Sequence, residues 1–175
     1  ILSLRQQCVD SNIPFQFHQT GANFIKDGKT YRVPRRQQIA QAKKAGKTVV
    51  FTRDTHHENY LQTQEGKNLP VPHCIENTPG WEIDPALDTT GARIFDKPSF
   101  GSEELVQYLK GLDNLTSAEF VGLCTDICVI TNVLSAKCAL PELPIAVDSA
   151  CCAGVTPESH ENALAAMRMC QIRIL

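Results

Sequence analysis

Residues 118–129 read AEFVGLCTDICV, and this stretch decides the class of fold. The run 118–123 is apolar and favours a strand, and a helical pattern follows it directly, from about Asp126 to Ala139. A strand that leads straight into a helix is typical of a βα unit in a parallel sheet. The stretch therefore predicts an α/β protein.

Apolar runs and helical patterns alternate on both sides of this unit. We expect further strands at 47–52, 143–148 and 171–175, and further helices at 36–45, at 102–109 and from Thr156 onward. Ser102 and Thr156 are typical N-cap residues. From Arg53 to Pro98 the chain is rich in Pro, Gly, Asn, Thr and His, and it is expected to form a long irregular excursion. In a compact domain such a stretch is either functional or contains elements that the pattern does not display.

Length and composition favour a single domain spanning 1–175. The chain has 175 residues, 42% hydrophobic and 21% charged, and its eight cysteines are too sparse for a disulfide scaffold, so we expect them to be mostly reduced. A net charge of -2 gives no reason to expect a nucleic-acid partner, and no apolar run approaches the ~20 residues of a membrane span. The N-terminus lacks a signal-peptide pattern and does not open with Met, so we expect a soluble, cytoplasmic protein that starts inside a longer gene product.

The opening stretch also carries a candidate nucleophile. Cys128 falls in the first turns of the expected helix, where unpaired N–H groups and the helix dipole lower the pKa of a thiol and can hold an oxyanion. Two other interpretations stay open. Cys128 can be an inert core thiol, or it can form a C-x-x-x-C metal pair with Cys124, although no second Cys/His pair lies at zinc-finger spacing.

A second group of residues has the composition of a metal site. Asp54 and His56 directly follow the strand at 47–52, and alternate residues of an extended segment point the same way. Glu65 and His73 follow in the irregular excursion, and two imidazoles with two carboxylates suit Zn²⁺, Mn²⁺ or Fe²⁺. The alternative is that these polar side chains are merely solvated, as we expect for the neighbouring His57.

A third motif, IFDKPSF at residues 94–100, places Lys97 after an apolar pair. By itself this motif is equally typical of a surface lysine at the end of a strand. It gains meaning from its position between the other two motifs.

Together the three motifs resemble the cysteine hydrolase (isochorismatase-like) superfamily. The order and approximate spacing agree over roughly residues 33–175, through Asp54-x-His56, Glu65, Pro72-His73-Cys74, Lys97 with Phe100, and GLCTDICV. The metal residues point to the nicotinamidase-like branch, since related isochorismatases use no such metal site. The resemblance implies a doubly wound, mostly parallel six-stranded sheet with helices on both faces.

The resemblance also implies the catalytic roles. Cys128 takes the position of the nucleophile and Lys97 that of the active-site lysine, while Asp10, five residues before Phe15, takes that of the catalytic acid. The backbone N–H groups of Cys124 and Cys128 would hold the oxyanion, with a cis peptide before Cys124. Polar residues precede Asp10, unlike a buried strand, so a surface residue in a divergent N-terminus is the alternative.

The function implied is that of a metal-containing amidohydrolase. It would convert nicotinamide and water to nicotinate and ammonia through a thioester of Cys128, with one divalent ion, Zn²⁺ before Mn²⁺ or Fe²⁺, held by Asp54, His56, Glu65 and His73. Phe15, Leu69, Phe100 and Cys124 would contact the substrate, and Pro70 stands where nicotinamidases usually carry an aromatic residue.

Two alternatives stay open: hydrolysis of another small substrate, such as a ureido or carbamoyl compound or an isochorismate-like ether, and a non-catalytic superfamily member. The expected partner is a small-molecule amide, with neither nucleic acid nor membrane, and a homo-oligomer is compatible with the sequence.

Overall fold

The computed structural model describes residues 23–26, 29–32 and 35–175, with side chains from residue 39 onward. Asp10 and Phe15, two of the expected site residues, lie outside this part of the chain. The elements are, in chain order, β1 (Asn23–Lys26), β2 (Lys29–Arg32), α2 (Arg35–Lys44), β3 (Val50–Asp54), η1 (Tyr60–Gln62), α3 (Gln64–Asn68), β4 (Arg93–Lys97), α4 (Glu103–Lys110), β5 (Ala118–Leu123), the π-helical η2 (Thr125–Val129), α5 (Ile130–Ala139), β6 (Ile145–Ala153), α6 (Pro157–Met169) and β7 (Arg173–Ile174).

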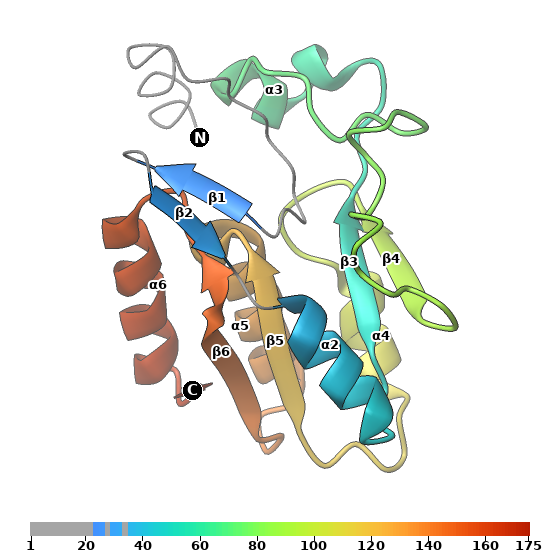
Figure 1. Cartoon of the computed structure of the whole chain (residues 1–175), viewed down its shortest axis with the longest axis vertical. Helices are drawn as coiled ribbons and strands as arrows, with labels where there is room; N and C mark the ends of the chain where they lie inside the picture. The colour runs from blue at the N-terminus through green and yellow to red at the C-terminus, as the bar shows by residue number, and fades with distance from the viewer. Residues whose placement is uncertain (1–22, 27–28, 33–34) are drawn as a thin grey trace.

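The described strands form two parallel sheets and one antiparallel pair. β3 pairs with β4, and their register places Asp54 opposite Lys97. β5, β6 and β7 form the second parallel sheet, whereas β1 and β2 pair with each other in antiparallel fashion. In Figure 1 the arrowheads of β3, β4 and β5 point toward the same end of the molecule, so their carboxyl ends share that end.

This arrangement agrees with the expected fold in part. The parallel pairing and the alternation of strands and helices agree with the prediction, but the described residues do not join into one six-stranded sheet. The segment before Asp10, where the family resemblance implies a first strand, lies outside the described residues.

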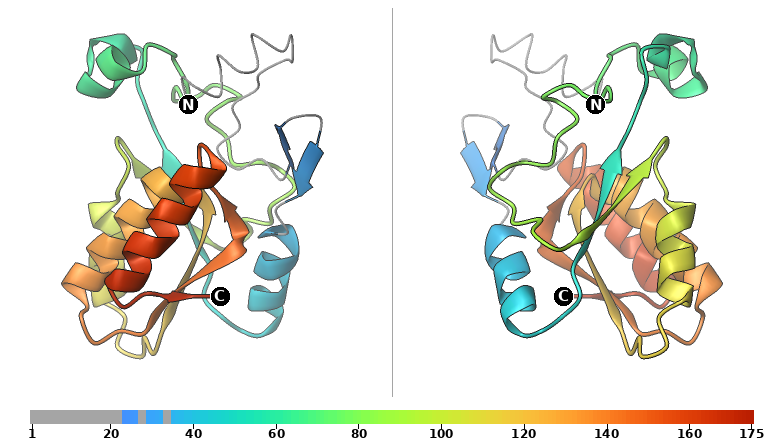
Figure 2. Two further views of the ribbon diagram at one scale, coloured as in Figure 1. Left: turned by 90° about the vertical axis from the view of Figure 1, so that its left-hand side faces the viewer. Right: turned by 90° about the vertical axis from the view of Figure 1, so that its right-hand side faces the viewer.

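Helices cover both faces of the parallel strands. Figure 2 shows α2 on one side and α4, α5 and α6 on the other. The hydrophobic core includes four residues that are at most 1% exposed: Phe95, Val133, Val147 and Met167. Burying a side chain of this size stabilises the fold by ~1.5–3 kcal/mol, so the strand ends rest on a firmly packed layer.

The boundaries differ from the predictions mainly at the strands. β3 begins at Val50 rather than at residue 47, β6 runs on to Ala153, and β4 lies inside the stretch that we expected to be irregular. In β4 the buried positions are Phe95 and Lys97, while Ile94 and Asp96 are exposed. Because a lysine occupies an inward position, the sequence does not show the alternation of apolar and polar residues that is typical of a half-buried strand. The sequence analysis therefore did not predict this strand.

The expected helix starts are confirmed by their caps. The Ser102 hydroxyl accepts a hydrogen bond from the Leu105 N–H at the start of α4. At the start of α6 the Thr156 hydroxyl accepts from the Ser159 N–H. Each such cap contributes ~1 kcal/mol to stability.

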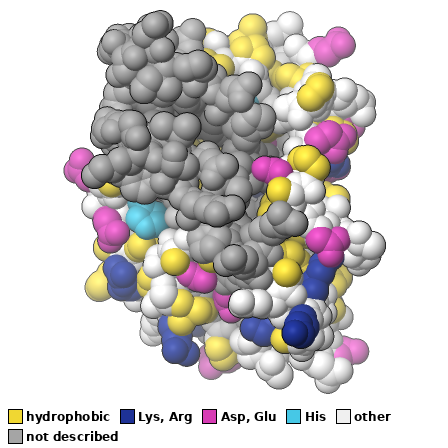
Figure 3. All heavy atoms as spheres, viewed as in Figure 1, with side chains coloured by type: hydrophobic (Ala, Val, Ile, Leu, Met, Phe, Trp, Pro, Cys, Tyr) yellow, Lys and Arg dark blue, Asp and Glu magenta, His cyan; other side chains and the backbone are white. Residues whose placement is uncertain are grey.

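Two surface features bear on partners. Among the described residues, no helix has the length and apolar character that crossing a bilayer requires. In the view of Figure 3, acidic and basic side chains are interspersed over the described surface rather than gathered into areas of one sign.

Candidate active site

The junction of β5 and η2 presents Cys128. The Leu123–Cys124 peptide at the end of β5 is cis, as the resemblance implied. The N–H groups of Ile127 and Val129 both donate to the Cys124 carbonyl oxygen at 3.1 Å, which closes the turn. Cys128 is partly exposed, so its thiol is not sealed in the core.

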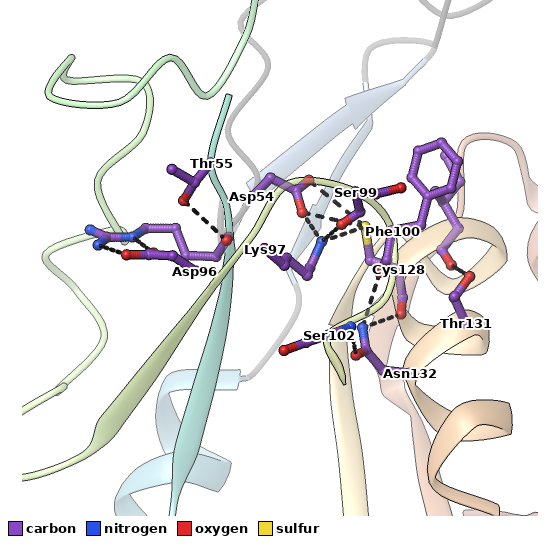
Figure 4. Close-up of polar contacts among 12 residues, drawn as sticks. Asp54, Thr55, Asp96, Lys97, Ser99, Phe100, Ser102, Cys128, Thr131 and Asn132 are labelled. Atoms are coloured by element: carbon purple, nitrogen blue, oxygen red, sulfur yellow. Dashed lines mark hydrogen bonds and ion pairs between the residues drawn. The ribbon is translucent and has the colours of Figure 1, made fainter. Parts of the chain in front are cut away.

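Lys97 reaches this thiol from the end of β4. Its side chain is only 2% exposed, which excludes the interpretation as a surface lysine. Its Nζ donates to the Ser99 carbonyl oxygen at 2.9 Å and to Cys128 Sγ at 3.5 Å, and it forms an ion pair with Asp54 (Figure 4). Burial lowers the pKa of Lys97, while the Cys128 thiol acts in the opposite direction.

Asp54 is the carboxylate that the described residues place beside this pair. It ends β3, opposite Lys97, and is 8% exposed. The Cys128 thiol lies within hydrogen-bond reach of both carboxylate oxygens, 3.8 Å from Oδ2 and 4.0 Å from Oδ1. The pairing of β3 with β4 brings the carboxylate and the ammonium together, and η2 adds the thiol, which is an arrangement that favours proton transfer from the thiol.

His56, Glu65 and His73 form a separate group that can hold a metal ion. One potential ligand atom from each lies within 4.8 Å of the others. Glu65 Oε1 lies 3.7 Å from His56 Nε2 and 3.6 Å from His73 Nε2. Asp54, which we expected among the metal ligands, is not part of this three-residue group.

The segment after β3 positions these ligands through Tyr60. The Tyr60 ring is 1% exposed and packs against the rings of His56 and His73, with centroids 4.8 and 5.1 Å away. Its hydroxyl donates to the Leu69 carbonyl oxygen at 2.9 Å. Gly66 lies so close to Tyr60 that an added Cβ would come within 2.0 Å of the Tyr60 carbonyl oxygen, so α3 rests directly on this segment.

The chemistry of the donor set fits a divalent cation. His56 Nε2 is buried and has no hydrogen-bond partner among the described residues, as expected of an atom that binds a metal. Burial, followed by the neighbouring His73 and His57, lowers the pKa of His56 to about 4, which keeps the imidazole in its neutral, ligating form. His73 Nδ1 lies 2.9 Å from the Val71 carbonyl oxygen, so an N–H there leaves Nε2 to ligate. Burial also raises the pKa of Glu65.

The expected substrate contacts are only partly placed. Leu69 follows α3, and its N–H donates to the Glu65 carbonyl oxygen at 2.7 Å. Phe100 is 42% exposed and lies on the segment after β4. Cys124 begins the turn that carries Cys128, whereas Phe15 lies outside the described residues.

The sequence analysis did not single out Asn132, which links the turn of Cys128 to the segment after β4. Its side chain is buried at 4% exposure and donates to the Cys128 carbonyl oxygen at 2.8 Å and to the Phe100 carbonyl oxygen at 3.1 Å. Its Oδ1 accepts from the Ser102 N–H at 3.0 Å (Figure 4). The available signal was a polar amide four residues after the cysteine, one helical turn along the same face.

Comparisons with known proteins show what this chain is similar to. A nicotinamidase from Schizosaccharomyces pombe is 28% identical over 166 residues, and the match covers 73% of each chain. A pyrazinamidase from Pyrococcus horikoshii, solved in complex with zinc, gives a TM-score of 0.69 at 27% identity and covers 82% of this chain and 83% of its own. An N-carbamoylsarcosine amidase from Thermoplasma acidophilum shares the fold, with a TM-score of 0.62 at 18% identity over 81% and 79% of the two chains.

The chain also matches the sequence model of a protein family, the isochorismatase domain, over residues 31–174. This range includes β3, β4, the three-residue group that can hold a metal ion, and the turn of Cys128. Since that match covers most of the chain, this protein is a member of the isochorismatase family.

Proposed function

We propose that this protein is a metal-containing cysteine amidohydrolase that acts on a small carboxamide of the nicotinamide type. The observation that carries the proposal is the meeting of the Cys128 thiol with the Lys97 ammonium and a carboxylate at the end of β3. The same strand end supplies His56 to the metal-binding group, so the two chemical groups share one edge of the sheet.

The reaction begins at the thiol. A carboxylate accepts the proton of Cys128, and the Lys97 ammonium beside it stabilises the thiolate. Asp10 is the acid that the family resemblance implies, and Asp54 is the carboxylate that lies beside the thiol in the described residues. The choice between them is open to a direct test, given in the Discussion.

The thiolate then attacks the amide carbonyl carbon. A carbon–sulfur bond forms, and the backbone N–H groups of Cys124 and Cys128 are proposed to hold the oxyanion. The carbon–nitrogen bond breaks, and ammonia leaves with the proton taken from the thiol. Water hydrolyses the thioester, which releases the carboxylic acid and restores the thiol.

A divalent ion held by His56, Glu65 and His73 would supply a Lewis-acid site for a heteroaromatic ring nitrogen of the substrate. Such a site would orient a pyridine or pyrazine carboxamide. The names of the relatives from Schizosaccharomyces pombe and Pyrococcus horikoshii support this class of substrate.

The proposal is tested by measuring ammonia release from nicotinamide, pyrazinamide and an N-carbamoyl amine by the zinc-loaded protein. We expect release from the two carboxamides, and none from the Cys128→Ala variant. Release from the carbamoyl compound alone would assign a different substrate. Equal release by wild type and Cys128→Ala would overturn the proposal.

A further inference from the structure

The turn that carries Cys128 is held by the connection between β6 and α6. Thr125, the first residue of η2, is 0% exposed, and its hydroxyl lies 2.8 Å from His160 Nδ1 on α6. The next residue, Asp126, accepts the Val155 N–H at 3.1 Å on one carboxylate oxygen and 3.2 Å on the other. Two consecutive residues of the turn are therefore bound, one by the connection between β6 and α6 and the other by α6 itself.

The His160 bond holds whichever neutral tautomer is present. A hydroxyl can accept from an Nδ1–H or donate to a bare Nδ1, so the contact needs no particular protonation of the ring. The His160 side chain is mostly buried, at 17% exposure, which keeps water from competing for the bond.

The backbone around Gly154 is shaped for this contact. A Cβ on Gly154 would lie 2.8 Å from His160 Cβ and 2.9 Å from the His160 backbone nitrogen. Only a glycine lets the end of β6 approach α6 so closely, and this approach places the Val155 N–H against Asp126.

We propose that His160, through Thr125, is a positioning residue that holds the backbone N–H groups of the Cys124–Cys128 turn where they meet the oxyanion. This role rests on the proposed amide hydrolysis and goes beyond it, because His160 does not contact Cys128 in any described interaction. Thr125 lies between Cys124 and Cys128 in the chain, so we expect a shift of its side chain to move the two N–H groups that the proposed mechanism assigns to the oxyanion. Misplacing an oxyanion donor weakens binding of the transition state more than binding of the substrate.

The test compares His160→Leu, which removes the bond, with His160→Asn, whose amide offers a polar atom where Nδ1 lies. We expect His160→Leu to lower kcat by ~10–100-fold, in line with the loss from an imperfect oxyanion hole, while KM for nicotinamide stays within about twofold. His160→Asn recovers most of the loss. Thr125→Val, which keeps the shape and removes the hydroxyl, reproduces it, whereas Thr125→Ser does not.

A second measurement separates this inference from the proposed function. Pyridine-3-carbaldehyde binds when the thiolate adds to its carbonyl carbon and the carbonyl electron pair moves to oxygen, which then needs the same N–H donors. We expect its affinity to fall in His160→Leu and Thr125→Val by the same factor as kcat, and to stay unchanged in the control His57→Ala. If the wild type hydrolyses no amide, the proposed function fails, and the aldehyde affinities still decide the role of His160. Unchanged aldehyde affinity in both variants, or a loss that His160→Asn fails to recover, overturns the inference.

Discussion

Lys97 is a buried lysine whose surroundings determine its chemical role. At 2% exposure its ammonium lies among the Cys128 thiol, the Asp54 carboxylate and the Ser99 carbonyl oxygen. Burial lowers its pKa, so without these acceptors a charged lysine would be costly at this place. A buried ammonium 3.5 Å from the thiol supports the proposed role of Cys128 as the nucleophile.

At the residue scale we expect the two cysteines of the turn to differ sharply. Cys128→Ala abolishes amidase activity because it removes the atom that attacks the carbonyl, and it leaves the fold intact. Cys124→Ala has a far smaller effect, since only its backbone N–H takes part. Initial rates of ammonia release with thermal melts of both variants check this prediction, and equal losses would contradict it.

The two candidate carboxylates are separated by a second pair of variants. We expect Asp10→Asn to cut turnover by ~10²–10⁴, the usual contribution of a general base, with the metal still bound. Asp54→Asn removes the negative charge that lies beside Lys97 and Cys128, so we expect it to lower turnover. We expect this variant to keep its metal, because the three-residue group is unchanged.

Turnover measured beside metal content distinguishes the outcomes of this pair. A near-wild-type rate for Asp10→Asn would assign the proton-accepting role to Asp54. Loss of the metal from Asp54→Asn would support the sequence-based prediction that Asp54 is a metal ligand.

At the scale of elements, the segment from η1 to α3 acts as a support for the metal ligands. The Thr63 hydroxyl accepts from the Gly66 N–H at 3.0 Å and donates to the Tyr60 carbonyl oxygen at 2.7 Å, so it ties α3 to η1. The Tyr60 ring in turn packs against His56 and His73. Glu65 is therefore held against both histidines by a small set of local contacts.

Gly66→Ala tests this support. A Cβ at this position would meet the Tyr60 carbonyl oxygen at 2.0 Å and carbon at 2.7 Å, both of them backbone atoms, so α3 must move. We expect metal affinity to fall by at least tenfold because Glu65 is displaced from His56 and His73. Gly80→Ala is the control, since an added Cβ there has no neighbour within 4 Å. Calorimetric titration with zinc measures the affinities. Equal affinities for both variants would refute the role of α3.

For the whole molecule, we expect the proposed metal binding to be coupled to stability. His56 comes from the strand end, while Glu65 and His73 come from the long segment between β3 and β4. An ion that binds all three is bound only by the folded chain, so it stabilises that chain by mass action.

We therefore expect a chelator to lower the melting temperature as well as activity. Free metal at a hundred times its Kd contributes ~2.7 kcal/mol, and each kcal/mol moves the midpoint of a protein of this size by about 2–4 °C. His56→Ala and His73→Ala should melt at the chelated temperature with or without zinc. His57→Ala should keep the response to zinc, because the His57 ring lies outside the three-residue group and faces Glu76 at 3.3 Å. A zinc response that is lost in His57→Ala, or kept in His73→Ala, would remove the metal assignment.

Most of the sequence-based predictions that the structure reproduces are local. The strand 118–123, the caps Ser102 and Thr156 and the helix after Cys124 depend on neighbouring residues, whose propensities and hydrogen bonds the sequence displays directly. β4 was not predicted because its inward-facing Lys97 interrupts the alternation of apolar and polar residues. The resemblance to the isochorismatase-like superfamily followed from separated motifs, and the match to residues 31–174 confirms it.

Only the tertiary structure decided which side chains meet. The sequence predicts Asp54 as a metal ligand from its spacing to His56, but only the register of β3 on β4 and the packing of η2 reveal that it also lies beside Lys97 and Cys128. It also gave no reason to connect Thr125 with His160, which lies 35 residues away on α6. Strand register and helix packing bring distant residues together through the whole core, whereas the composition of a local segment reports only on its neighbours.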